Sequence, residues 1–178
     1  MSSRHRFNFL KPFTRFLRNE RGATAVEYAL VGPIFLLLLV GQFELAYMMF
    51  TSVIVDGATA SAARLVRTGQ VQTAADPVAA FQTQLCNRLY GVISCNKLSY
   101  DVRTSSTFAG ITFGLTFDED GTPTDAGFST GTVGDIVVVT VTYRWTFYTP
   151  MVYTLFGDSQ GTTKRIYSTA VFRNEPYL

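Results

Sequence analysis

A lone acidic residue near the start of an apolar segment is the feature of this chain most suggestive of chemistry. Glu27 is the fifth residue after Gly22, in a stretch that is otherwise uncharged from Ala23 onward. A carboxylate inside a membrane costs roughly 2.5–3.5 kcal/mol on insertion scales, so it calls for a partner. Cleavage after Gly22 would create an α-amino group at Ala23, one helical turn from Glu27. That amine could pair with the carboxylate within one chain or between neighbouring helices, and the charge would then set the register between packed subunits.

An uncleaved chain offers a simpler interpretation of the same residues. Glu27 would then lie at the cytoplasmic interface of an anchor helix, and Tyr28 would be one of the aromatic residues common at membrane boundaries. A second glutamate, Glu44, lies near the outer end of the apolar segment. For Glu44 we expect a structural role rather than an intersubunit salt bridge.

Residues typical of catalysis or metal binding are sparse. The single histidine, His5, lies in the basic leader, so a processed chain would have no histidine base and no histidine ligand. The sequence has no phosphate-binding glycine loop and no serine in a nucleophile-elbow pattern. We therefore expect no enzyme activity, no cofactor and no metal site.

One acidic cluster has the ligand type that calcium prefers, since hard cations bind clustered carboxylates. Ser129, however, stands where an EF-hand loop would need its bidentate glutamate. We favour a solvated acidic turn and leave calcium binding open. The carboxylates concerned are Asp118, Glu119, Asp120 and Asp125.

Charge is distributed unevenly along the 178 residues, which have a formal net charge of +2 from 15 basic and 13 acidic side chains. Residues 1–22 hold 6 of the basic residues and 1 acidic residue, so the rest of the chain, with 9 basic and 12 acidic residues, has a net charge of −3. A nucleic-acid-binding protein needs its basic residues on the folded body. We therefore exclude nucleic acid as a partner.

The apolar segment predicts a membrane anchor. No residue from Tyr28 to Phe43 is formally charged, and with the flanks 23–26 and 45–50 the segment exceeds the roughly 20 residues of a spanning helix. The basic leader should remain in the cytoplasm, which places the following residues in the periplasm, beyond a bacterial inner membrane. A cleaved signal peptide is disfavoured, because the apolar stretch is long and its far end has no convincing small-x-small site; the small residues at Ala58–Ala63 lie too far downstream. Pro33, after Gly32, predicts a kink in the helix.

The two cysteines, Cys86 and Cys95, lie close together in the sequence. Because their part of the chain is predicted to lie outside the cytoplasm, we favour a disulfide over two free thiols. A bond closing so short a loop would be a local staple that adds a few kcal/mol at most.

Helical patterns continue beyond the apolar segment. The first helix is predicted to run on to about Arg67, and residues 68–75 form a linker. Two pairs of small residues four apart, which could let another helix approach closely, are Gly57/Ser61 and Ala58/Ala62. A second helix is predicted to begin at Asp76-Pro77, an N-cap acid followed by proline, and to stop near Gly91.

The remaining residues favour strands. Alternation of apolar and polar residues predicts strands at 98–103 and 137–147, the second of them half-buried. Further strands of an antiparallel sheet are expected at 111–117 and 163–172. The stretch Pro150–Phe156 is apolar for a loop and could be a contact surface or a cover for the sheet. The prediction is an α+β fold with three parts: a leader (1–22), a long transmembrane and amphipathic helix (23–67), and a small head of one further helix and an antiparallel sheet (68–178).

The stretch Gly22-Ala23-Thr24-Ala25-Val26-Glu27-Tyr28 resembles the processing site of TadE-like pseudopilins, the minor pilins of the tight-adherence (Tad/Flp) type IVb pilus system. In that family a glycine is followed by four residues and then Glu-Tyr. The C-terminal stretch from Ala170 to Tyr177 is similar to the ending of many TadE-like proteins. The resemblance is strongest over residues 15–67 and 165–178.

This resemblance implies a structural component of pilus assembly, and through it a part in adhesion and biofilm formation. A prepilin peptidase would cut between Gly22 and Ala23, with Gly22 as the recognition residue and Glu27 and Tyr28 as assembly residues. The implied partners are another pseudopilin, the assembly platform in the inner membrane and the major pilin. The alternative is an uncleaved, signal-anchored periplasmic binding or envelope-scaffold module, which would need a pocket in its head.

Overall fold

The computed structural model describes residues 22–111, 115–118, 123–158 and 161–177. The predicted leader, with His5, lies outside these residues except for Gly22. The chain divides into two compact units between Phe43 and Glu44, and each is described by itself.

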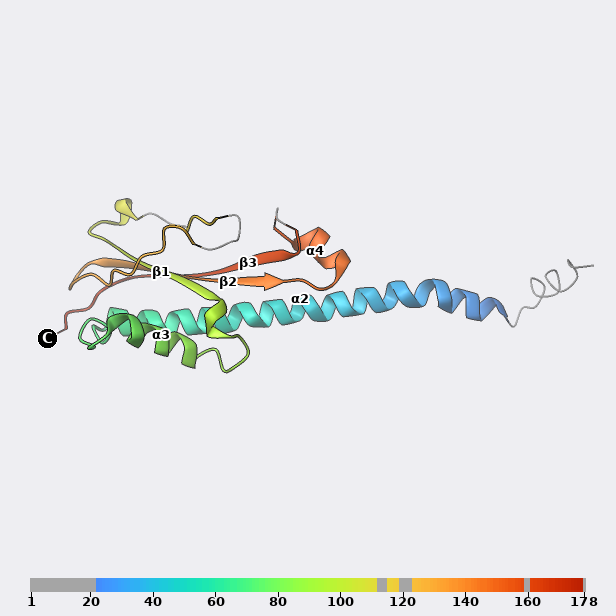
Figure 1. Cartoon of the computed structure of the whole chain (residues 1–178), viewed down its shortest axis with the longest axis horizontal. Helices are drawn as coiled ribbons and strands as arrows, with labels where there is room; N and C mark the ends of the chain where they lie inside the picture. Colours follow the sequence, from blue (N-terminus) through green and yellow to red (C-terminus); the bar gives the residue numbers. More distant parts are fainter. Residues whose placement is uncertain (1–21, 112–114, 119–122, 159–160, 178) are drawn as a thin grey trace, which may run out of the picture. The chain divides into compact units, whose positions relative to one another are not determined.

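Within the described residues, a long helix is followed by further short helices and an antiparallel sheet, which confirms the α+β prediction (Figure 1). The α-helices are α2 (Ala23–Arg67), α3 (Pro77–Asn87) and α4 (Pro150–Phe156). The strands are β1 (Leu98–Ser105), β2 (Ile136–Thr146) and β3 (Thr163–Arg173), and the short 3₁₀ helices are η2 (Cys95–Lys97) and η3 (Phe108–Gly110).

The first unit, as far as it is described, is the N-terminal part of α2. Nearly all of its side chains are exposed, and the helix continues through Pro33 without interruption. In the described part of the chain, α2 is the one helix long and apolar enough to cross a membrane. This finding fits the predicted membrane anchor.

The second unit is built around the sheet, in which β2 lies between β1 and β3 and all pairs are antiparallel. Val102 on β1 pairs with Val139 on β2, and Val139 pairs with Ala170 on β3, so the three share one face. Strands predicted at 98–103, 137–147 and 163–172 are thereby confirmed, with ends shifted by one or two residues.

The core lies between this face of the sheet, α3 and the part of α2 that follows Phe43 (Figure 1). Ala58 and Ala62 are fully buried there, so this small pair packs within its own chain. Helix α3 approaches α2 at the other pair, where the Gln84 side-chain amide donates to the Ser61 hydroxyl (2.7 Å). Phe81 of α3 is in ring contact with Tyr100 and Phe128, with centroids 5.2 and 5.5 Å away. Other core residues are Val55, Val66, Leu85, Leu89, Val137 and Val141.

The predicted strand at 111–117 is not confirmed: residues 112–114 lie outside the described residues, and of the others only Phe117 makes an isolated bridge, to Pro123. The prediction that the strand at 137–147 is half-buried was wrong. β2 is not half-buried: residues 136–142 are buried on both faces. The connection between β1 and β2 contributes to this burial, since Leu115 is buried and Phe117 packs on Tyr167, with ring centroids 6.2 Å apart.

Helix α3 and the disulfide follow the prediction closely. The Asp76 carboxylate accepts a hydrogen bond from the Ala79 amide (3.0 Å), which caps the helix. Cys86 in its last turn is bonded to Cys95, with Cα atoms 5.5 Å apart, as predicted. The helix ends at Asn87, and the chain then turns through Gly91, whose φ of +73° suits glycine.

The apolar stretch Pro150–Phe156, which resembled a loop in sequence, is the short helix α4. Val152 is buried in a second cluster with Trp145, Phe147 and Ile166. α4 therefore covers the end of the sheet with one side and leaves Leu155 and Phe156 exposed.

The C-terminal ending is tied to the head by polar contacts. The Asn174 side-chain amide donates to the carbonyls of Thr130 and Thr132. Glu175 forms an ion pair with Arg67 (2.9 Å), and its amide donates to the Arg67 carbonyl. In this structure the ending therefore fastens the last strand to the end of α2.

Candidate functional site

The residues predicted to direct processing and assembly lie together at the start of α2. Gly22 directly precedes Ala23, the first residue of the helix, and both are followed by a turn of exposed side chains. A helix has 3.6 residues per turn, so Glu27 and Val31 lie on the same face. Glu27 and Tyr28 line a shallow depression on the helix surface, and Gly22 and Ala23 do not.

This depression measures about 350 Å³ and is lined by Glu27, Tyr28, Val31, Gly32 and Phe35. A Cβ placed on Gly32 would meet no atom within 4 Å, so the depression is open to an outside group at this position. Among the described residues Glu27 has neither a hydrogen bond nor an ion pair. The site thus combines a carboxylate without a partner and an apolar, partly aromatic rim, which suits an amine or a donor brought by another molecule or a new N-terminus.

Glu44, the second glutamate of α2, has a different environment. Its two carboxylate oxygens accept hydrogen bonds from the backbone amides of Tyr148 (2.5 Å) and Thr149 (3.1 Å). These amides belong to the connection between β2 and α4. The prediction of a structural role for Glu44 is confirmed.

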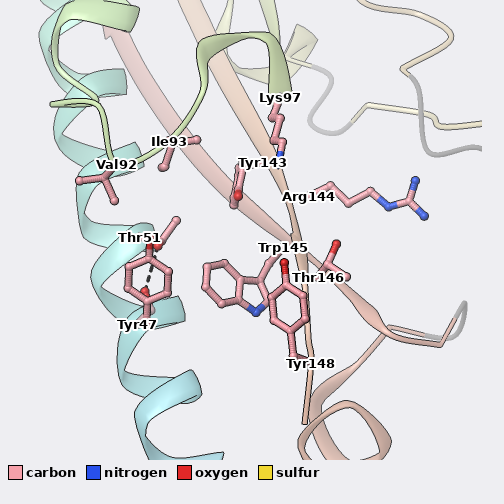
Figure 2. A pocket seen from close by; sticks show the side chains of 10 residues that line it. All are labelled: Tyr47, Thr51, Val92, Ile93, Lys97, Tyr143, Arg144, Trp145, Thr146 and Tyr148. Atoms are coloured by element: carbon pink, nitrogen blue, oxygen red, sulfur yellow. Dashed lines mark hydrogen bonds between the residues drawn. The ribbon is translucent and has the colours of Figure 1, made fainter. Parts of the chain in front are cut away.

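The head contains a pocket that the sequence did not reveal (Figure 2). It measures about 220 Å³ and lies between α2, the segment before β1 and the end of β2. Its lining residues are Tyr47, Thr51, Val92, Ile93, Lys97, Tyr143, Arg144, Trp145, Thr146 and Tyr148. Alternation along β2 placed Tyr143 and Trp145 on one face, which was the single signal available, because the other walls come from distant parts of the chain.

Two features of the pocket are electrostatic. Burial raises the pKa of the Tyr143 hydroxyl above its usual value, and the nearby hydroxyls of Tyr47 and Tyr148 add to this effect. The Trp145 indole N–H is buried and has no hydrogen-bond partner among the described residues. Tyr47 packs edge-on against Trp145, with centroids 5.3 Å apart. The pocket is therefore lined by aromatic rings that carry polar groups, the tyrosine hydroxyls and the indole N–H.

The acidic cluster is only partly described, because Glu119 and Asp120 lie outside the described residues. Asp125 accepts hydrogen bonds from the Arg103 guanidinium and the Thr116 amide, which lower the pKa of its carboxyl to about 2. Arg103 also pairs with Asp101 (2.7 Å). Asp125 thus holds the β1–β2 connection onto β1, and the question of calcium binding stays open.

Comparison with known proteins gives a match in the N-terminal part of the chain, which contains Glu27 and Tyr28. Residues 22–64 match the family profile described as TadE-like protein. This match covers less than half of the chain, and the C-terminal ending 165–178 lies outside it. No curated protein and no solved structure matches the chain.

The matched segment begins at Gly22, includes Glu27 and Tyr28, and ends in the part of α2 that packs on the sheet. The family suggests an association with tight-adherence pilus systems. The resemblance drawn from Gly22 to Tyr28 is confirmed by this match: residues 22–64 are similar to the corresponding part of TadE-like proteins.

Proposed function

We propose that this chain is a minor pseudopilin of a tight-adherence pilus, processed by a prepilin peptidase between Gly22 and Ala23. The observation that carries the proposal is the coincidence of three boundaries. The family match starts at Gly22, α2 starts at Ala23, and the last basic residue of the leader is Arg21. A peptidase acting there would release a chain that begins with its membrane helix.

Processing would give Glu27 its partner. The new α-amino group at Ala23 is positively charged near neutral pH, since such groups titrate near pH 8. In the low-dielectric interior of a membrane, an amine and a carboxylate attract each other far more strongly than in water. Pairing with the amine of a neighbouring subunit would fix the axial register of two helices, and Tyr28 and Phe35 would pack around the pair.

The arrangement supports a structural role rather than catalysis. The residues of the matched segment that could bind a partner lie on an exposed helix surface, and assembly requires such a surface. The basic leader would keep the N-terminus in the cytoplasm, and the disulfide between Cys86 and Cys95 suits a periplasmic head. The partners would be the peptidase, another pseudopilin, the assembly platform and the major pilin.

The pocket beside Trp145 favours one alternative function, a signal-anchored periplasmic binding module. It has the concave shape and the few polar groups that small-molecule sites share. Its volume of about 220 Å³ is below the usual range of such sites, which begins near ~300 Å³. A binding module would have no need of cleavage after Gly22.

The deciding experiment is the intact mass and N-terminal residue of the membrane-extracted chain, with and without the cognate prepilin peptidase. We expect a start at Ala23 only when the peptidase is present. Gly22→Val should abolish processing, whereas Gly32→Val is the matched control, because a Cβ at either glycine meets no atom within 4 Å. A chain that keeps its leader in both strains would refute the pseudopilin proposal and favour the binding module.

A further inference from the structure

One end of the head exposes a group of large apolar side chains. Tyr148 is 85% exposed, Leu155 69% and Phe156 46%. Tyr148 lies in the connection between β2 and α4, and the other two are the last residues of α4. We call these three residues the apolar foot.

The apolar foot is held firmly although its side chains face outward. Val152 of α4 is buried against Trp145, Phe147 and Ile166. The amide of Phe147 also donates to the Thr162 carbonyl (2.8 Å). The three exposed side chains therefore project from a well-packed segment, which can present the same surface to each partner.

The position of the foot along the chain points to its partner. Glu44, the first residue of the second compact unit, accepts hydrogen bonds from the backbone amides of Tyr148 and Thr149, which hold the foot beside it. Glu44 directly follows Phe43, the last residue of the uncharged apolar run. A helix that spans a membrane with this run and its flanks leaves the hydrocarbon between Glu44 and about Phe50, so the foot is tied to the region of exit.

The composition of this end is that of a membrane interface. Trp and Tyr are enriched at the headgroup level, where their rings are apolar and their tips are polar. Tyr47, Trp145 and Tyr148 lie near one another here (Figure 2). Lys97 and Arg144 line the same pocket, with the Arg144 side chain pointing away from the three rings. Cationic side chains near a membrane surface are attracted to anionic phospholipids.

We propose that the apolar foot rests on the phospholipid surface from which α2 emerges, with Leu155 and Phe156 in the zone between headgroups and acyl chains. The foot gives the head a second attachment to the bilayer beside α2. The inference requires that α2 spans the membrane, but it does not depend on cleavage after Gly22 or on pilus assembly. Its failure would leave the proposed function untouched.

The test uses the full chain reconstituted in phosphatidylethanolamine/phosphatidylglycerol vesicles. Since the native cysteines are bonded to each other, a single introduced cysteine takes an environment-sensitive fluorophore. Leu155→Cys reports on the foot. Phe108→Cys is the matched control, because Phe108 is also 69% exposed but lies in η3 at the other end of the head (Figure 1).

We expect a blue-shifted emission for the label on the Leu155→Cys variant, and several-fold stronger quenching by spin-labelled lipid than for the control. Equal quenching of both labels, with full access of aqueous iodide, would overturn the proposal. Tyr148→Cys supplies a second foot position should Leu155→Cys disturb α4, which circular dichroism and the thermal midpoint would reveal.

A protein partner on the same surface would give a different result. Contact between copies of the chain would protect the foot label only at high protein-to-lipid ratio and without lipid quenching, and that outcome would also overturn the proposal. Lipid quenching that persists on dilution of the protein in the vesicles supports it. Replacement of phosphatidylglycerol by phosphatidylcholine should weaken the quenching, because the attraction between the exposed Lys97 and anionic lipid is then lost.

Discussion

Glu27 and Glu44 lie on the same helix but in different surroundings. Glu27 belongs to the first unit and has no ion pair or hydrogen bond among the described residues. Glu44 belongs to the second unit, and both of its oxygens accept backbone hydrogen bonds. One carboxylate is satisfied by its own chain, and the other requires a group from outside or from a processed N-terminus.

The same contrast holds for the two units as a whole. Residues 22–43 expose nearly every side chain, and their apolar surface has no core of its own chain to join. The head buries a continuous cluster from α2, α3 and the sheet. Exposed apolar patches of this size mark interaction surfaces or membrane contacts. The first unit therefore has an apolar surface suited to contact with a membrane or another molecule, whereas the second unit buries its apolar side chains in a core of its own.

The strongest test of this contrast replaces one phenylalanine in each unit. Phe81→Ala removes a fully buried ring that contacts Tyr100 and Phe128, and we expect the free energy of unfolding of the head to fall by about 3–5 kcal/mol. Phe35→Ala, at a 59% exposed position of the first unit, should change it by less than about 0.5 kcal/mol. Chemical denaturation of the full chain in detergent micelles, followed by Trp145 fluorescence, measures both. Similar losses for the two variants would break the comparison.

The disulfide should give the next largest effect. The double variant Cys86→Ser/Cys95→Ser removes a bond between residues nine apart in sequence, which the chain-entropy account values at roughly 2–3 kcal/mol. The expected result is a lower denaturation midpoint for the head and an unchanged N-terminus after processing. Reductant should lower the midpoint of the unmodified chain to the same extent and leave the double variant unaffected. A double variant that reductant still destabilises would show that the loss has another source.

The elements that sequence patterns predicted are those stabilised by local order. Apolar and polar residues alternate along β1 and the second half of β2, and α3 begins with an N-cap acid and a proline. The bounds of these elements came out within a few residues. The connection between β1 and β2 could not be predicted in this way. Phe117 packs on Tyr167, and Asp125 binds Arg103, so its path depends on contacts with residues distant in sequence.

The candidate sites also differ in whether their residues are close together in the sequence. Gly22, Glu27 and Tyr28 form a contiguous motif, so their spacing alone predicted a site at the start of the helix. The pocket beside Trp145 takes its walls from α2, the segment before β1 and β2, and no local pattern connects them. The partners of Glu44 likewise lie more than a hundred residues away along the chain. Sequence showed that Glu44 was acidic and near a boundary, but not which amides it would bind.

Replacing each of the two glutamates by alanine should have different effects on the stability of the head, the larger of them intermediate in size. Glu44→Ala leaves the amides of Tyr148 and Thr149 without their acceptor, and we expect the head to lose about 1–3 kcal/mol. Glu27→Ala should leave the stability of the head within about 0.5 kcal/mol of the unmodified chain. In cells the order should reverse, because Glu27→Ala, with a folded head, should nearly abolish pilus formation. Denaturation midpoints and counts of surface pili measure the two effects, and normal piliation in Glu27→Ala would remove the assembly role of Glu27.

The smallest expected effect concerns an exposed ion pair of the head and appears only in acid. Arg103 and the Thr116 amide lower the pKa of Asp125 from 3.8 to about 2. A carboxyl whose pKa is lower in the folded state stabilises the fold above its unfolded pKa, and that contribution is lost as the pH falls through the folded pKa. We therefore expect Asp125→Asn to make the head slightly less stable at neutral pH and to flatten its loss of stability between about pH 4 and pH 2.

Asp135→Asn is the control for this last prediction. Its carboxyl also has a lowered pKa, but the cause is hydrogen bonding to the Thr132 amide and hydroxyl instead of a cation. Salt screens charge pairs at the surface more than neutral hydrogen bonds. The difference between the unmodified chain and Asp125→Asn should therefore shrink at high ionic strength, while the difference for Asp135→Asn should persist. Thermal midpoints measured from pH 7 to pH 2 at two salt concentrations separate the two, and equal salt dependence would show that Arg103 does not act on Asp125 through its charge.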